Sequence, residues 1–180
     1  MALTRSHFTN EDDMTMVQGN CKVCGAPVVV EAPPGFEGAE LIGCVCPTCA
    51  DAELLEKGGA VFAPPHLEGA LFPLGSKVTV TPRAVAVLKE ANLDALDFVA
   101  RHVCGDWGRG VKAADITVTD SELKLGQMAT EDDDKLNKIA VLTGQGRVLS
   151  NYALPNGGRL WVLTSLGAGG YTTAMLPEDY

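Results

Sequence analysis

The pattern of apolar and polar positions becomes regular only in the second half of the chain. Residues 77–81 alternate valine with polar residues, which is typical of a short strand. Thr81 and Pro82 then predict a helix start, because an N-cap residue is followed by proline at the first helical position. Apolar residues recur on one broad face of the segment that follows. Asn92 is expected to cap a second helix, which ends at Gly105.

A third helix and three strands complete this pattern. Acidic residues at the positive N-terminal end and a glycine at the other end delimit a helix over residues 131–144. Helices followed by an antiparallel meander predict an α+β domain over residues 77–180. The strand-like runs of the meander are separated by glycine-rich turns and cover residues 147–154, 159–165 and 171–176.

Before residue 77 the pattern is irregular and indicates three segments. Residues 1–20 are polar and lack apolar periodicity, so they are expected to form a mobile tail. Residues 21–57 contain five of the six cysteines and are expected to be a separate module. Residues 58–76 are rich in glycine and proline, which predicts an irregular linker laid against a surface by its apolar side chains.

Two Cys-x-x-Cys pairs are the strongest chemical signal in the sequence. Cys21 and Cys24 form the first pair, and Cys46 and Cys49 form the second. Two residues between thiolates allow a tight turn to aim both sulfurs at one ion, and two such turns supply the four ligands of a tetrahedral zinc site. We therefore expect a zinc-ribbon-like module that holds a structural Zn²⁺. Cys44 is an alternate ligand in place of Cys46.

Two other interpretations of these cysteines stay open, a redox-active or iron–sulfur site and buried thiols without a metal. Redox chemistry normally needs one such pair at a helix start and not two matched pairs, which favours zinc. A closed site of four thiolates has no open position for a substrate, so the zinc would not be catalytic. Cys104, outside the cluster, is expected to be a small buried hydrophobe.

Composition limits the partners and the location of the protein. The chain of 180 residues is 46% apolar and carries a formal net charge of −9. This acidic balance excludes a broad basic face for sequence-independent nucleic-acid binding, although local binding through a few arginines stays open. No apolar run approaches the ~20 residues of a membrane span, and the first residues lack the apolar core of a secretory signal. We therefore expect a cytoplasmic protein without a membrane partner, and no nucleotide-cofactor motif is present.

Several strings within residues 77–180 resemble a known family. In their order they are similar to small, largely uncharacterised proteins of phages and plasmids, of the type called plasmid-related proteins. The stretch after Gly108 is longer here, and Asp134 stands where an aromatic residue is usual. The resemblance implies an accessory protein of a mobile genetic element. The strings are RHVCGDWG at 101–108, GRVLSNY at 146–152, LWVLT at 160–164 and TTAMLPEDY at 172–180.

The favoured hypothesis is a zinc-binding accessory protein that binds a host protein or a nucleic acid, with counter-defence as one such role. The alternative is a ribonuclease-type toxin, since helices before an antiparallel meander also resemble the barnase-like fold. His102 would then be the base or acid, Arg147 or Arg159 would bind phosphate, and Thr164 and Thr172 would donate hydroxyl groups. A structural role for His102 is the simpler interpretation, so the balance favours a non-enzymatic protein.

A transcriptional regulator in which the cysteine module reads DNA is a further alternative. Residues 21–57 contain two lysines against six acidic residues. This ratio argues against tracking of DNA phosphates by the module.

Overall fold

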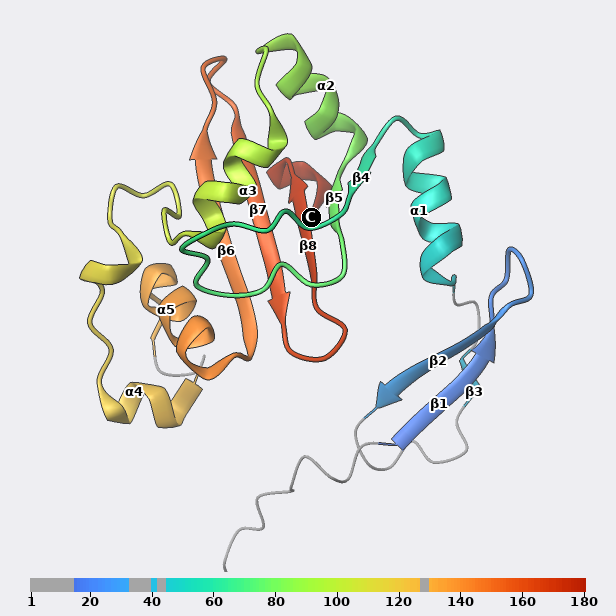
Figure 1. Cartoon of the computed structure of the whole chain (residues 1–180), viewed down its shortest axis with the longest axis horizontal. Coiled ribbons are helices and arrows are strands. Elements are labelled where there is room, and N and C mark those ends of the chain that lie inside the picture. Colours follow the sequence, from blue (N-terminus) through green and yellow to red (C-terminus); the bar gives the residue numbers. More distant parts are fainter. Residues whose placement is uncertain (1–14, 33–39, 42–44, 127–129) are drawn as a thin grey trace, which may run out of the picture. The chain divides into compact units, whose positions relative to one another are not determined.

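The computed structural model describes residues 15–32, 40–41, 45–126 and 130–180 (Figure 1). The chain divides into two compact units, Met1–Glu53 and Leu54–Tyr180, and each is described by itself. Helices and sheets are both present, which confirms the α+β class. Within these described ranges, no helix has the length and apolar character that crossing a bilayer requires.

The sheet of unit 1 has three strands in the order β2-β1-β3. β1 (Thr15–Asn20) and β2 (Pro27–Ala32) form an antiparallel hairpin, and β3 (Glu40–Leu41) pairs parallel with β1. The prediction of a mobile tail is wrong for residues 15–20, because β1 pairs with β2 along its full length. The valine-rich run of β2 supplies this partner, and tertiary pairing overrides the weak local pattern of β1. The remainder of the predicted tail lies outside the described residues.

The sheet of unit 2 has five strands in the order β4-β5-β8-β7-β6. β6, β7 and β8 form the antiparallel meander that the sequence predicts. β5 then pairs parallel with β8, and β4 pairs antiparallel with β5. The strands are β4 (Ala60–Phe62), β5 (Val78–Val80), β6 (Gly146–Ala153), β7 (Arg159–Leu166) and β8 (Tyr171–Met175).

The segment over residues 58–76 contributes to the fold of unit 2 and is not a linker laid on its surface. β4 extends the sheet, and Phe72 and Leu74 are buried in the hydrophobic core. Gly75 has a φ of 82°, and a Cβ added there would lie 2.0 Å from the carbonyl oxygen of Gly170. The segment therefore passes close against the β7–β8 turn, where only glycine fits. Its apolar residues pack into the core. The high glycine and proline content of the segment does not indicate this role in the sequence.

Two helices, α2 (Pro82–Glu90) and α3 (Ala95–Val103), lie over one face of this sheet (Figure 1). α2 begins as the sequence predicts, because the Thr81 hydroxyl oxygen accepts the N–H of the third helical residue at 3.4 Å. α3 is capped by Asp94 and not by Asn92. The Asp94 carboxylate accepts the N–H of the second helical residue at 2.9 Å, whereas Asn92 adopts a φ of 53° in the turn between the helices.

α5 (Asp133–Thr143) is the third predicted helix, whereas α4 (Asp120–Leu125) is not predicted by the apolar pattern. A capping box starts α4, since Thr119 and Glu122 each accept the other's backbone N–H. Lys135 of α5 contacts Glu122 at 2.7 Å, which joins the two helices. The described part of unit 2 also contains the 3-10 helices η2 (Ala113–Asp115) and η4 (Pro177–Asp179).

The two faces of the unit 2 sheet differ in character, because alternate strand residues point to opposite sides. One face packs against α2 and α3 and forms the core, with Val78, Val148 and Val162 fully buried. We call the opposite side the outer face. From the strand pairing, its positions are Val61, Thr79, Arg147, Leu149, Asn151, Ala153, Arg159, Trp161, Leu163, Ser165, Tyr171, Thr173 and Met175.

β6 lies at the end of the sheet, and its outer backbone groups are occupied by other parts of unit 2. The Asn137 side chain of α5 donates to the Leu149 carbonyl and accepts the Leu149 N–H, both at 2.8 Å. The N–H of Asn151 donates to the carbonyl of Trp107 at 3.0 Å. An unpaired strand edge is a template for association with other chains. α5 and the Trp107 loop therefore protect this edge.

The string over residues 101–108 forms a tight corner after α3. The Arg101 Nε donates to the Asp106 carboxylate at 2.8 Å, and the Arg101 guanidinium lies 4.6 Å from the centre of the Tyr152 ring. The Tyr152 hydroxyl donates to the Asp106 carbonyl at 2.6 Å. Trp107 is fully buried. These contacts give the string a role in packing, while the buried Nε1 of Trp107 has no hydrogen-bond partner among the described residues.

Candidate functional site

The first predicted pair of zinc ligands lies in the hairpin turn of unit 1. Cys21 directly follows β1, and Cys24 lies in the turn that leads to β2. The Cys21 N–H donates to the Ala26 carbonyl and the Gly25 N–H donates to the Cys21 carbonyl, both at 2.8 Å. Gly25 has a φ of 74°, which glycine adopts without the steric cost of a Cβ. The turn therefore holds both sulfurs at one end of the sheet.

The second predicted pair lies at the N-terminus of α1 (Pro47–Glu56). Cys46 immediately precedes the helix, and Cys49 lies in its first turn. The Cys46 carbonyl accepts the Ala50 N–H at 3.0 Å, so Cys46 occupies the cap position. The Cys46 N–H donates to the Cys21 sulfur at 3.2 Å. This bond connects the two pairs, and a backbone N–H aimed at sulfur favours the thiolate.

The four sulfurs have the spacing of ligands around one ion. All four Sγ atoms lie within 4.8 Å of one another, and the Sγ atoms of Cys24 and Cys46 are 3.7 Å apart. Ligands at tetrahedral angles and a Zn–S length of ~2.3 Å would be about 3.8 Å apart. Cys21 and Cys46 are buried, whereas Cys24 is exposed. The four cysteine sulfurs can therefore bind one metal ion between the β1–β2 turn and the start of α1.

The contacts within the cluster shift the acidities of two of its thiols in opposite directions. The N–H of Cys46 is the main cause that lowers the pKa of Cys21 to about 6. Hydrogen bonding to the Cys24 and Cys46 sulfurs raises the pKa of Cys49 to about 12. The Cys21 thiolate therefore forms readily, whereas the neighbouring sulfurs oppose ionisation of Cys49. A bound metal cation removes this opposition, because its charge stabilises all the thiolates together.

The remaining two cysteines have different outcomes. Cys44 lies outside the described residues, so its role as an alternate ligand stays a prediction. Cys104 was expected to be buried and is exposed. It follows the last buried residue of α3, Val103, and falls off the buried stripe of that helix. None of the five cysteines in the described part of the chain forms a disulfide.

His102 of unit 2 belongs to a buried chain of hydrogen bonds. Its Nδ1 lies 2.6 Å from the Ser150 hydroxyl oxygen, and its Nε2 lies 2.9 Å from that of Thr164. The Thr164 hydroxyl oxygen is 2.8 Å from that of Thr172. The Thr172 hydroxyl donates to the Leu74 carbonyl at 2.7 Å. This series of hydrogen bonds therefore runs through the core, from Ser150 of β6 to Leu74 in the segment before β5.

The Leu74 carbonyl can only accept, and this fixes the direction of every bond in the network. Thr172 uses its proton on Leu74, so Thr164 must donate to Thr172. The Thr164 oxygen then accepts the proton on Nε2 of His102, which leaves Nδ1 to accept from Ser150. The ring is neutral in this arrangement. Burial alone lowers the pKa of His102 to about 3, which agrees with a neutral ring.

Three of the residues that the ribonuclease hypothesis requires are thus brought together. His102, Thr164 and Thr172 have no solvent-exposed surface, so their contacts are internal. Arg147 and Arg159 lie on the outer face of the sheet, on the opposite side from this network. The geometry therefore joins the histidine to both threonines and separates it from both arginines.

Two residues with side-chain contacts in unit 2, Ser150 and Arg109, are not identified from the sequence. Ser150 completes the network of His102, and the available signal was a polar residue at a core-facing position between two apolar ones in β6. Arg109, in the loop after α3, forms an ion pair with Asp133 at the start of α5. Nothing in the sequence distinguishes Arg109 from other surface arginines.

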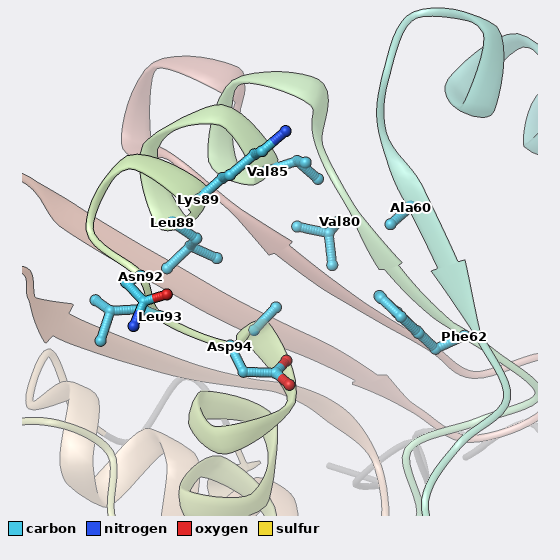
Figure 2. Close-up of a pocket in the computed structure, with 10 residues that line it drawn as sticks. Ala60, Phe62, Val80, Val85, Leu88, Lys89, Asn92, Leu93 and Asp94 are labelled. Carbon is cyan, nitrogen blue, oxygen red and sulfur yellow. The ribbon is translucent and has the colours of Figure 1, made fainter.

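Unit 2 also has a cavity of about 430 Å³ between β4, β5 and the junction of α2 and α3 (Figure 2). Its walls are mostly apolar and include Phe62, Val80 and Leu88, and Lys89 and Asp94 contribute polar groups. No cysteine, histidine, serine or threonine lines it. The cavity therefore lacks a thiol, imidazole or aliphatic hydroxyl nucleophile, and its ionisable side chains are those of Lys89 and Asp94.

The fold and the site define a two-unit α+β protein whose first unit carries a candidate four-cysteine metal centre. No family model, curated protein or solved structure matches the chain. Its function therefore has to follow from the chemistry of its own residues.

Proposed function

We propose that the chain is a zinc-binding accessory protein that acts by binding a macromolecular partner and not by catalysis. The observation that carries the proposal is the convergence of four cysteine sulfurs within 4.8 Å. Soft thiolate ligands suit Zn²⁺ and disfavour Mg²⁺ or Ca²⁺, which prefer oxygen. Four protein ligands also close the coordination sphere, so no position is left for water or substrate.

The composition of the unit 1 core supports a structural role for the ion. In its described part, the buried hydrophobic residues are Val17, Cys21 and Cys46. These three side chains alone would not offset the conformational entropy lost on folding, and modules of this size usually need a metal or disulfides. Zinc held by the four cysteines would join the β1–β2 turn to the start of α1. The metal would thus act as the centre of the core.

The partner in this proposal is a host protein or a nucleic acid, in the reducing cytosol of a cell that harbours a phage or plasmid. The resemblance of residues 77–180 to proteins of mobile elements supports this setting, and counter-defence is one role that fits it. The burial of His102 supports a binding function, because a general base must reach the proton it removes.

Expression in one bacterial host distinguishes this proposal from the ribonuclease-type toxin. Wild type and His102→Gln are expected to allow equal growth and to leave cellular RNA intact, since His102 is inaccessible to a substrate. Growth curves and the integrity of ribosomal RNA on gels measure both effects. RNA degradation by wild type that is absent from His102→Gln would contradict the proposal and favour the toxin.

A further inference from the structure

The outer face of the unit 2 sheet differs from the rest of this acidic protein. The chain carries a formal net charge of −9, yet the outer-face strand positions defined above include two arginines and no acidic residue. Arg147 is near one end of β6, and Arg159 starts β7. Both side chains are exposed. Their rows are six residues apart along β7, which corresponds to about 20 Å of strand.

Aromatic side chains lie between and beside these two arginines. The rings of Trp161 and Tyr180 meet edge to face with centres 5.8 Å apart, and the Arg147 Nη1 donates to the Tyr180 hydroxyl at 2.8 Å. Tyr180 is 70% exposed, and Tyr171, in the same row as Arg147 but separated from it by Ser165 of β7, is 46% exposed. Large aromatic surfaces are usually covered in a protein. Here the Tyr171 and Tyr180 side chains are exposed on the same face as the two arginines.

A cavity of about 330 Å³ opens among these residues. Its lining combines apolar walls with the Arg147 guanidinium and the Trp161 and Tyr180 rings. The Trp161 Nε1 is buried and has no hydrogen-bond partner among the described residues. The Nε1 of Trp107 in the core also lacks a partner, so the unpaired indole supports a ligand site only because Trp161 lines a cavity, where a ligand oxygen or nitrogen would accept from it. The volume is within the range of small ligand sites and accommodates a planar base.

Two acids near this face are paired with cations, whereas Glu178 lines a small surface cavity with Arg159. Asp133 lines the cavity but forms an ion pair with Arg109. Asp179 of η4 lies 3.7 Å from the Arg83 guanidinium and accepts the Thr81 hydroxyl at 2.6 Å. The repulsion that the two paired carboxylates would exert on an approaching phosphate is therefore reduced.

We propose that the outer face binds single-stranded nucleic acid, with phosphates at Arg147 and Arg159 and bases stacked on Tyr171, Tyr180 and Trp161. This inference rests on the proposed function and names its partner. Sheets that present aromatic rings beside cations bind single strands, because unpaired bases can stack on the rings. A duplex keeps its bases stacked inside and cannot use such rings. An acidic protein partner would match the charge of the two arginines, but it would leave the exposed aromatic rings unexplained.

The test is fluorescence anisotropy with labelled oligo-dT and oligo-rU of about 15 nucleotides, close to the longest sites of single-strand binding folds. Wild type is expected to bind either or both, with affinity that falls as salt rises. The double substitution R147E and R159E should weaken binding at least about tenfold and lower the salt slope by about 1.4, the value for two phosphates. Tyr171→Ala should weaken binding about fivefold or more through lost stacking.

The matched control is the double substitution K89E and K124E, which changes the net charge by the same amount on exposed lysines of α2 and α4. It should bind like wild type. Stacking should also quench tryptophan emission from Trp161, since the other tryptophan, Trp107, is fully buried. Normal emission of the free variants confirms that they are folded.

Three results would overturn the inference. These are no oligonucleotide binding by wild type, equal weakening in both double variants, or a protein partner that competes for this face without any nucleic-acid binding. In each case the proposed function survives if the chain retains zinc and a macromolecular partner. Cleavage of the oligo-rU by wild type would instead contradict the proposed function itself.

Discussion

Replacement of Cys46 by serine is expected to release the metal and unfold unit 1, while unit 2 keeps its fold. The substitution removes one of four sulfurs and leaves an incomplete site. Structural zinc contributes about 10–16 kcal/mol of apparent binding free energy in comparable peptides. In the part of unit 1 whose burial is described, the buried hydrophobic residues besides Cys46 are Val17 and Cys21, which cannot compensate for such a loss. The effect should therefore be the largest of any single substitution in the chain.

Amide hydrogen exchange measures this prediction separately in each unit. The amides of β1 and β2 should exchange rapidly in Cys46→Ser, and those of β6 and β7 should stay protected. Both tryptophans, Trp107 and Trp161, belong to unit 2, so their fluorescence reports on that unit alone. Cys104→Ser is the matched control, because it removes an exposed cysteine outside the cluster. Retained protection of β1 and β2 in Cys46→Ser would show that the metal does not hold unit 1.

The stability of unit 2 is expected to fall with decreasing pH because of His102. Its pKa is lowered by burial from 6.5 to about 3, so the folded chain leaves the ring neutral where the unfolded chain protonates it. The unfolded state binds more protons below pH 6.5, and the free energy of unfolding therefore decreases as pH falls. The expected slope approaches about 1.4 kcal/mol per pH unit well below pH 6.5, which amounts to about 1.6 kcal/mol between pH 6.5 and pH 5. Most carboxylates titrate below this window.

Denaturant unfolding followed by tryptophan fluorescence measures the slope. His102→Gln should flatten it and should also lower stability by at least about 2 kcal/mol, since the Ser150 hydroxyl loses its acceptor in the core. His66→Gln, at an exposed position, is the matched control and should keep the slope of wild type. An equal slope in wild type and His102→Gln would mean that the buried ring is not the titrating group.

The sequence predicts the parts of this protein that depend on local chemistry. The two cysteine pairs, the Thr81 cap and the meander of unit 2 each follow from residues a few positions apart. Each of these features depends on the spacing of nearby residues, so the sequence predicts it without a structure. The same holds for α5, whose acids and terminal glycine mark both of its ends.

Features that depend on distant partners could not be read in this way. β1 is a strand because β2 pairs with it, and β4 joins the sheet because β5 carries matching valines. The side chain of Asn137 looks like any polar helix residue until the edge of β6 lies beside it. Tertiary contacts determine these features, and the local sequence pattern does not predict tertiary contacts.

The direction of the hydrogen bonds at His102 shows the same limit in the candidate site. A histidine near an aspartate in sequence suggests a cap or a catalytic base. The tautomer instead follows from the Leu74 carbonyl, at the far end of a chain through Thr172 and Thr164. The outer face is a similar case, because Arg147 and Tyr180 are far apart in the sequence and meet only in the folded sheet.

Native mass spectrometry with elemental analysis shows whether the four cysteines hold one structural zinc ion. The purified chain is expected to carry one zinc per molecule, which a chelator removes together with the amide protection of β1 and β2. Cys46→Ser should carry none, and Cys104→Ser should carry the full amount. A chain that is folded in unit 1 and carries no metal would contradict the account.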